Sequence, residues 1–190
     1  MKAFGVFLAI AAVVGGATFS AWYFLVRVPS PVSVEEKNQP PYVFDDAGIR
    51  FEYPRTYTFE SYPLEDESTS WNSLMLVRTK EKLEAEANGA SEGPVAITIG
   101  IFPNVTNQSP QDWVLGDPHS NYALSNNQPL TPTTLGGKSA VSYTHSGLFE
   151  SDALVVAYND NIYLFEVSWA DAQDPIRTDF QTMLKSVQFK

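Results

Sequence analysis

The chain has 190 residues, the length of one ordinary domain with a terminal extension rather than of two domains. It contains 22 acidic residues against 12 lysines and arginines, and this net charge of −10 disfavours binding to nucleic acids and to anionic lipid headgroups. The absence of cysteine excludes disulfides, cysteine-ligated zinc and a lipid-modified cysteine anchor. With 44% hydrophobic and 13% aromatic residues, the chain has the composition of a protein with a folded core.

An uncharged apolar segment runs from Ala3 to Val26. As a helix it spans roughly 36 Å at about 1.5 Å per residue, enough to cross a hydrocarbon core of about 30 Å. Lys2 and a very short tail precede it, which favours an amino end that stays inside, and Trp22 suits the far headgroup layer. We therefore predict that residues 1–27 form a transmembrane signal-anchor of a single-pass cell-membrane protein, with the rest of the chain extracytoplasmic.

A cleaved signal peptide is the alternative for this segment. Phe4 to Val14 would be its apolar region, and the small residues Gly15 to Ala17 offer a cleavage site. The apolar run continues through Trp22 to Val26, however, which is long for a signal-peptide core and favours an uncleaved anchor. Both alternatives place the following domain outside the membrane.

Residues 28–41 follow as a proline-rich tether, with prolines at positions 29, 31, 40 and 41 among polar residues. The folded domain is then expected at residues 42–190. It opens with a predicted hairpin, in which Val43-Phe44 and Ile49–Tyr53 flank the turn formers Asp45 to Gly48.

Further strands and one loop are predicted in the first half of the domain. Thr56–Tyr62 is a short extended piece, Leu74–Thr79 is a strand, and Ala96–Phe102 is a central strand because its isoleucines alternate along one face. Lys80–Gly93 is charged and ends in glycine-rich turns, so it is expected to be mostly an exposed loop, with at most a helical turn within it. A short helix is expected to start at Pro110, capped by Ser109.

The last third of the chain has the clearest pattern. Lys138–His145, Phe149–Tyr158 and Ile162–Ala170 are predicted to be three antiparallel strands joined by short turns. Asp174 is expected to cap a helix that begins at Pro175 and carries an apolar stripe suited to packing on a sheet. An extended edge at Val187 to Phe189 is expected to finish the domain.

Three motifs mark the domain: Gly48–Pro54 (Gly-Ile-Arg-Phe-Glu-Tyr-Pro), Leu135–Ala140 (Leu-Gly-Gly-Lys-Ser-Ala) and Phe180–Phe189. In this order they resemble the PsbP-like family, named for an extrinsic subunit of photosystem II and shared with bacterial extracytoplasmic domains. The family tends to have a tryptophan shortly after the opening Tyr-Pro, where this chain has Tyr57. The resemblance implies an α+β domain, an antiparallel sheet flanked by helices in an α/β/α sandwich, and a module for binding or assembly rather than turnover.

The two histidines are the only candidates for histidine-based catalysis. His145 lies in phase with Tyr143 near a strand end, so we expect a partly buried, hydrogen-bonded side chain. His119 follows Asp117-Pro118 in a polar stretch and is expected to be exposed in a loop. Because no nucleophile elbow, phosphate-binding loop or zinc-protease motif occurs, no catalytic, metal or cofactor residue is assigned.

Two further groups of residues could take part in binding. The acidic residues Asp45-Asp46, Glu60 and Glu65–Glu67 could collect calcium, although their spacing is not that of an EF-hand loop. Tyr42, Tyr57 and Trp71 are candidates for a recognition patch, although packing in the core or at its rim is the commoner fate of such rings.

The sequence thus predicts a non-catalytic, membrane-anchored extracytoplasmic binding or assembly module with a protein or small-ligand partner. The alternative is a small extracytoplasmic hydrolase or other enzyme that uses His145 or His119 with a neighbouring acid.

Overall fold

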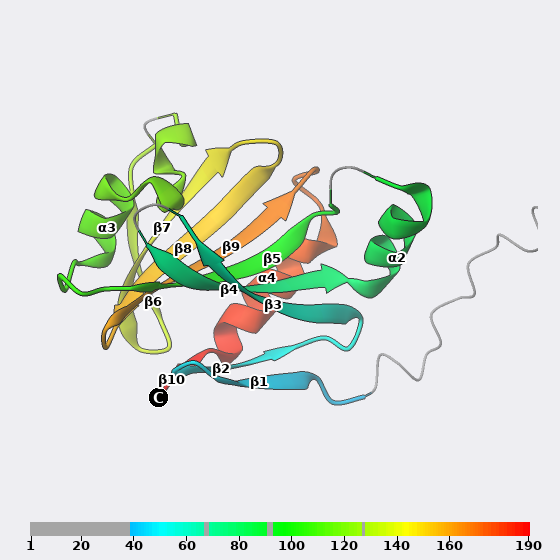
Figure 1. The fold of residues 1–190 in the computed structure, drawn as a ribbon, viewed down its shortest axis with the longest axis horizontal. Helices are drawn as coiled ribbons and strands as arrows, with labels where there is room; N and C mark the ends of the chain where they lie inside the picture. The colour runs from blue at the N-terminus through cyan, green and yellow to red at the C-terminus, as the bar shows by residue number, and fades with distance from the viewer. Residues whose placement is uncertain (1–38, 67–68, 91–92, 127) are drawn as a thin grey trace, which may run out of the picture. The chain divides into compact units, whose positions relative to one another are not determined.

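The computed structural model describes residues 39–66, 69–90, 93–126 and 128–190 (Figure 1). The predicted anchor at residues 1–27 lies outside these ranges, as does nearly all of the tether. Among the residues that are described, no helix is both long and apolar enough to cross a membrane.

The domain is built on two antiparallel sheets. The larger has seven strands in the order β3-β4-β5-β9-β8-β7-β6, and the smaller has three in the order β1-β2-β10. The strands of the larger sheet are β3 (Tyr57–Glu65), β4 (Ser70–Arg78), β5 (Ala96–Pro103), β6 (Thr131–Leu135), β7 (Lys138–Ser146), β8 (Glu150–Tyr158) and β9 (Asn161–Trp169). Those of the smaller sheet are β1 (Tyr42–Asp46), β2 (Ile49–Tyr53) and β10 (Gln188–Phe189).

Three α-helices and two 3₁₀ turns complete the described part of the domain: α2 (Thr79–Asn88), α3 (Pro110–Gly116), η2 (Pro118–Ser120), η3 (Tyr122–Leu124) and α4 (Pro175–Ser186). Both predicted helix starts are confirmed. The Ser109 side chain accepts a hydrogen bond from the Asp112 amide, and the Asp174 carboxylate accepts one from the Ile176 amide. In each helix a proline follows the cap, where its missing N–H costs no helical hydrogen bond.

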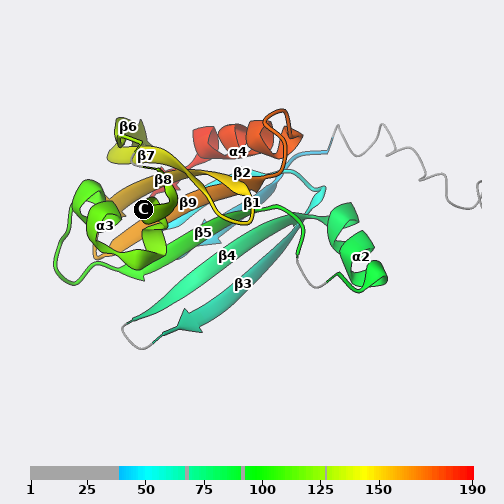
Figure 2. The same cartoon turned by 90° about the horizontal axis from the view of Figure 1, so that it is seen from above.

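The larger sheet has a hydrophobic core on each face. Tyr163, Phe165 and Val167 of β9 belong to the core that α4 and the smaller sheet cover, and Figure 2 shows α4 lying along that side. Ile162 and Leu164 point the other way, into a second core beneath α3 and the 3₁₀ turns. The predicted antiparallel sheet flanked by helices is confirmed, and the smaller sheet adds to one of its covering layers.

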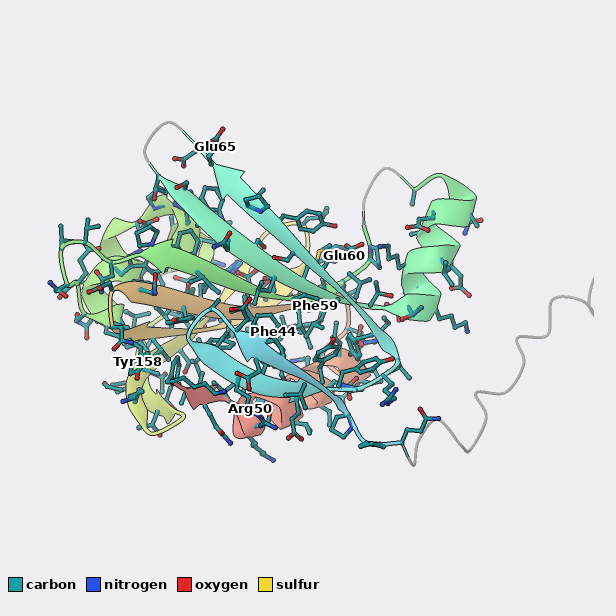
Figure 3. All side chains as sticks on the ribbon, turned by 60° about the horizontal axis from the view of Figure 1, so that its bottom comes forward. Phe44, Arg50, Phe59, Glu60, Glu65 and Tyr158 are labelled. Atoms are coloured by element: carbon teal, nitrogen blue, oxygen red, sulfur yellow. The ribbon has the colours of Figure 1, made fainter. Side chains whose placement is uncertain are left out.

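Aromatic rings join the two sheets at the edge strand β3. The rings of Phe44 on β1 and Phe59 on β3 have centroids 5.3 Å apart, and Figure 3 shows both side chains where the sheets meet. Phe44 also stacks on Phe51 at 5.0 Å. Tyr53 of the opening motif also packs against Phe59, with ring centroids 6.0 Å apart, so this motif contributes to the packing between the sheets.

The prediction of an exposed loop at Lys80–Gly93 is wrong for the first part of this segment, which forms α2. Two lysine–glutamate pairs one turn apart, Lys80–Glu84 and Lys82–Glu86, lie along this helix with nitrogen–oxygen distances of 3.9 Å. Gly89 ends it in the left-handed conformation at φ 61°. The helix buries none of its residues, so no apolar stripe marks it in the sequence.

Three strands extend beyond their predicted limits or were not predicted. β3 and β4 form one long hairpin, paired from Tyr57–Arg78 to Glu65–Ser70. β6 pairs with β7 through residues 131–135, a stretch of threonines with one proline that lacks a strand pattern. In each case pairing with a neighbouring strand fixes the extended conformation, which a local pattern does not reveal.

Candidate functional site

His119 lies in the 3₁₀ turn η2 and is held between two carboxylates. Its Nδ1 is 2.8 Å from Oδ1 of Asp117, the residue that caps the turn, and its Nε2 is 2.9 Å from Oδ2 of Asp66 at the end of the β3–β4 hairpin. Only 17% of the side chain is exposed. The prediction of an exposed loop histidine is therefore wrong, because residues distant in sequence enclose the ring.

Aromatic rings form the rest of the His119 environment. The His119 ring centroid is 4.6 Å from that of Trp71 on β4 and 5.3 Å from that of Phe102 on β5. Phe102 in turn packs against Trp113 of α3 at 5.1 Å. His119 thus connects the hairpin to the helical cover of the second core.

The surroundings of His119 suit a structural junction better than a catalytic base. Both ring nitrogens already face carboxylates, so neither is directed at an open substrate position. The adjacent Ser120 hydroxyl donates to the backbone, with the carbonyl oxygens of Val114 and Asp117 each 2.8 Å away. This serine is therefore not poised as a nucleophile for His119.

His145 is buried, as predicted, with 6% of the residue exposed. Its Nε2 is 3.4 Å from Oε1 of Glu166 on β9, but neither ring nitrogen makes a hydrogen bond within the described part of the chain. The expectation of a hydrogen-bonded ring is therefore not met. Burial, and secondarily the charge of Glu166, raises the pKa of the neighbouring Tyr143 above its usual value.

The strand register brings a serine next to His145, as a hydrolase would need. Ser151 lies directly opposite His145 across β7 and β8, and Glu166 supplies the acid. The Ser151 hydroxyl, however, is 3.3 Å from the Ser168 hydroxyl and makes no hydrogen bond to His145. A nucleophile–base–acid arrangement needs that hydrogen bond, so these residues share a face without forming a triad.

Of the acidic residues considered for calcium, Asp45, Glu60 and Asp66 are engaged in separate local contacts, and Glu67 lies outside the described residues. Asp45 pairs with Lys190, Glu60 pairs with Lys82, and the Asp66 carboxylate also accepts a hydrogen bond from the Thr69 amide at 2.8 Å. The hydrogen bond from Lys82, followed by that from the Tyr62 hydroxyl, lowers the pKa of Glu60. Within the ranges that the structure describes, no three acidic or histidine side chains converge on a metal position.

Two of the three candidate recognition aromatics pack against the domain. Tyr57 is buried, and its hydroxyl donates to the Asp179 carboxylate at 2.7 Å. Trp71 is partly buried against Phe102, with ring centroids 5.5 Å apart. Tyr42 is 42% exposed and lies beneath the Arg55 guanidinium, so the three rings do not form one patch.

A groove of about 410 Å³ lies between α4 and strands β6 to β8. Its lining includes Thr131, Ser142, Leu154, Phe180 and Gln181. Neither histidine lines this groove. The residues that the sequence offers for catalysis are therefore separate from this concave surface.

Comparison with known proteins shows similarity at the level of structure. No protein-family model matches the chain, and a search among curated proteins finds no match. The solution structure of cyanobacterial PsbP (CyanoP) from Synechocystis sp. PCC 6803 is similar at 14% identity and a TM-score of 0.51, covering 86% of this chain and 99% of that chain. A crystal structure from Bacteroides thetaiotaomicron VPI-5482 covers 80% of this chain and 48% of that chain at 8% identity, with a TM-score of 0.44. The similarity to CyanoP shows that this chain has a PsbP-like fold.

Proposed function

We propose that the protein is a membrane-anchored binding or assembly module whose PsbP-like domain lies outside the cell membrane. The uncharged segment Ala3–Val26, preceded by Lys2, supports the anchor and its orientation. The binding role rests on one observation above the others: each histidine is placed against carboxylates, and neither bonds a hydroxyl group in the described part of the domain. Neither candidate catalytic side chain is then poised to activate a nucleophile, which supports binding rather than turnover.

A hydrolase that uses Ser151, His145 and Glu166 is the second candidate, because these side chains share one face of the sheet. Labelling with a fluorophosphonate probe distinguishes the two functions. We expect wild-type protein, His145→Ala and His119→Ala to remain equally unlabelled. Labelling of the wild type that is lost in His145→Ala would establish the hydrolase and contradict the proposal.

Binding is tested with residues 42–190 immobilised and exposed to an extract of the cell envelope. We expect a partner to be retained after washing and to be released by free domain. A domain that retains nothing but turns over a substrate would contradict the proposed function.

A further inference from the structure

The β3–β4 hairpin projects beyond the layers that cover the larger sheet. The second core, under α3 and the 3₁₀ turns, reaches this hairpin through Trp71, and the residues of β3 from Ser61 to Glu65 are all exposed. Figure 2 shows the far ends of β3 and β4 extending away from α4. The outer half of the hairpin is therefore available to another molecule.

Large side chains gather on one face of this projecting hairpin. Leu64 is paired directly with Trp71 across the two strands, and Tyr62 lies two residues before Leu64 on the same face. Tyr62 and Leu64 are each 42% exposed, while Trp71 is fixed by its stacking on Phe102. These three residues, named here the hairpin patch, combine a rigid aromatic anchor with exposed apolar area, the composition found at the centre of protein interfaces.

Acidic residues lie next to the hairpin patch in the chain and at its tip. Glu65 follows Leu64 and lies at the outer end of β3 (Figure 3), and Asp66 and Asp117 flank the nearby His119. Six of the nine lysines and arginines in the described residues are held by carboxylates. The pairs are Arg50–Glu52, Arg78–Asp174, Lys80–Glu84, Lys82–Glu60, Arg177–Asp152 and Lys190–Asp45. With a net charge of −10, the chain favours a basic partner at this surface and repels an acidic one.

The edge of the hairpin disfavours docking by strand addition. Pro63 stands in the middle of the exposed part of β3 and lacks the backbone N–H that an added strand would need. The opposite edge of the sheet, β6, carries Pro132 in the same way. A partner is therefore expected to be recognised through side chains on the hairpin face.

We propose that the hairpin patch of Tyr62, Leu64 and Trp71 is the docking surface for a basic protein segment in which lysine or arginine alternates with apolar residues. Apolar side chains of the segment pack against Leu64 and Trp71, and its cations lie near Glu65. This inference rests on the proposed binding function and specifies the chemistry of the partner.

The test uses the full-length protein and a synthetic peptide of lysine–leucine–glycine repeats, with a glutamate–leucine–glycine peptide as its acidic counterpart. We expect the basic peptide to bind and the acidic one not to bind, by fluorescence anisotropy of labelled peptide. The Tyr62→Ser/Leu64→Ser double variant should weaken binding roughly tenfold or more. Leu148 lies on another hairpin and is 70% exposed, so Leu148→Ser is the control. This variant should change the affinity for the basic peptide less than about twofold.

The role of charge is tested in the same binding assay. Glu65→Lys should weaken binding of the basic peptide and reduce its dependence on salt, whereas Glu150→Lys at a distant exposed position should do so less. Circular dichroism of each variant confirms that the domain is folded.

Three results would overturn the inference. Unchanged affinity in the folded double variant would show that the peptide binds elsewhere, which leaves the binding function intact. Equal binding of the two peptides, or binding of neither, would contradict the proposal that the partner is basic. A wild-type dimer that Tyr62→Ser/Leu64→Ser dissociates in sedimentation experiments would assign the patch to a second copy of this chain.

Discussion

The hydroxyl of Tyr163 in the central strand β9 donates a hydrogen bond to the carbonyl oxygen of Ala47 in the turn between β1 and β2, at 3.0 Å. Ala47 and Gly48 have φ angles of 51° and 78°, which is the tight turn that suits a two-residue hairpin. A Cβ atom added at Gly48 would lie 2.7 Å from the Tyr163 hydroxyl oxygen. The glycine of the opening motif therefore permits both the turn and its attachment to the larger sheet.

Replacing Tyr163 by phenylalanine tests this attachment. We expect Tyr163→Phe to lower the free energy of unfolding by about 1 kcal/mol, because the hydrogen bond to Ala47 is lost while the buried ring remains. Urea denaturation followed by fluorescence measures the change. Tyr158→Phe is the control, since this ring packs on Phe189 and its hydroxyl makes no hydrogen bond to a described residue. Equal losses in the two variants would contradict a specific role for the Tyr163 hydroxyl.

The paired glycines of the second motif are expected to differ in importance. A Cβ atom at Gly136 would lie 2.9 Å from Cδ2 of Phe189 and 3.1 Å from the carbonyl oxygen of Val187, whereas one at Gly137 would meet nothing within 4 Å. Both glycines have positive φ, so Gly137→Ala measures the backbone strain alone. We expect Gly136→Ala to lower the free energy of unfolding by about 1–3 kcal/mol more than Gly137→Ala does. Thermal or urea denaturation of the two variants provides the comparison. Similar free energies of unfolding for both variants would contradict the predicted crowding of a side chain at position 136.

Alkaline pH is expected to destabilise the domain through its buried tyrosines. Burial is the largest cause that raises the pKa of both Tyr57 and Tyr143, so the folded state retains phenol protons that the unfolded state has lost. The stabilisation from this difference is fully present below pH 10 or so and is lost as pH rises above it. Each such group lowers the free energy of unfolding by at most about 1.4 kcal/mol per pH unit. Urea denaturation between about pH 9 and 11.5 should show the decline, with a shallower slope for Tyr143→Phe; an unchanged slope would contradict this assignment.

The parts of the fold that could be predicted from sequence are those with strong local patterns. Strands β7 to β9 alternate in hydrophobicity between short turns, and α4 has a capping aspartate, a proline and an apolar stripe. Helix α2 has no buried face, and β6 becomes a strand only because β7 lies beside it. Their conformations depend on charge pairs and on tertiary pairing, which a hydrophobic period does not report.

The histidine environments were less predictable for the same reason. Asp117 lies two residues before His119 and is evident in the sequence, but Asp66 reaches the ring only because the long hairpin brings it there. Glu166 meets His145 across two strand pairings, which requires the register of β7, β8 and β9. The exposed Tyr62 and Leu64 give no sequence signal that separates them from residues facing a core, because alternation alone does not reveal whether a strand face is covered.

The extracytoplasmic placement of the domain is tested by adding protease to intact cells. An epitope tag after Lys190 and a cytoplasmic control protein are followed by immunoblotting before and after the outer barriers of the cell are made permeable. We expect the domain to be degraded once protease gains access to the outer side of the cell membrane, while the cytoplasmic control stays whole and the domain remains in the membrane fraction until digestion. A domain that is digested only when the cell membrane itself is dissolved would contradict the extracytoplasmic placement on which the proposed function depends.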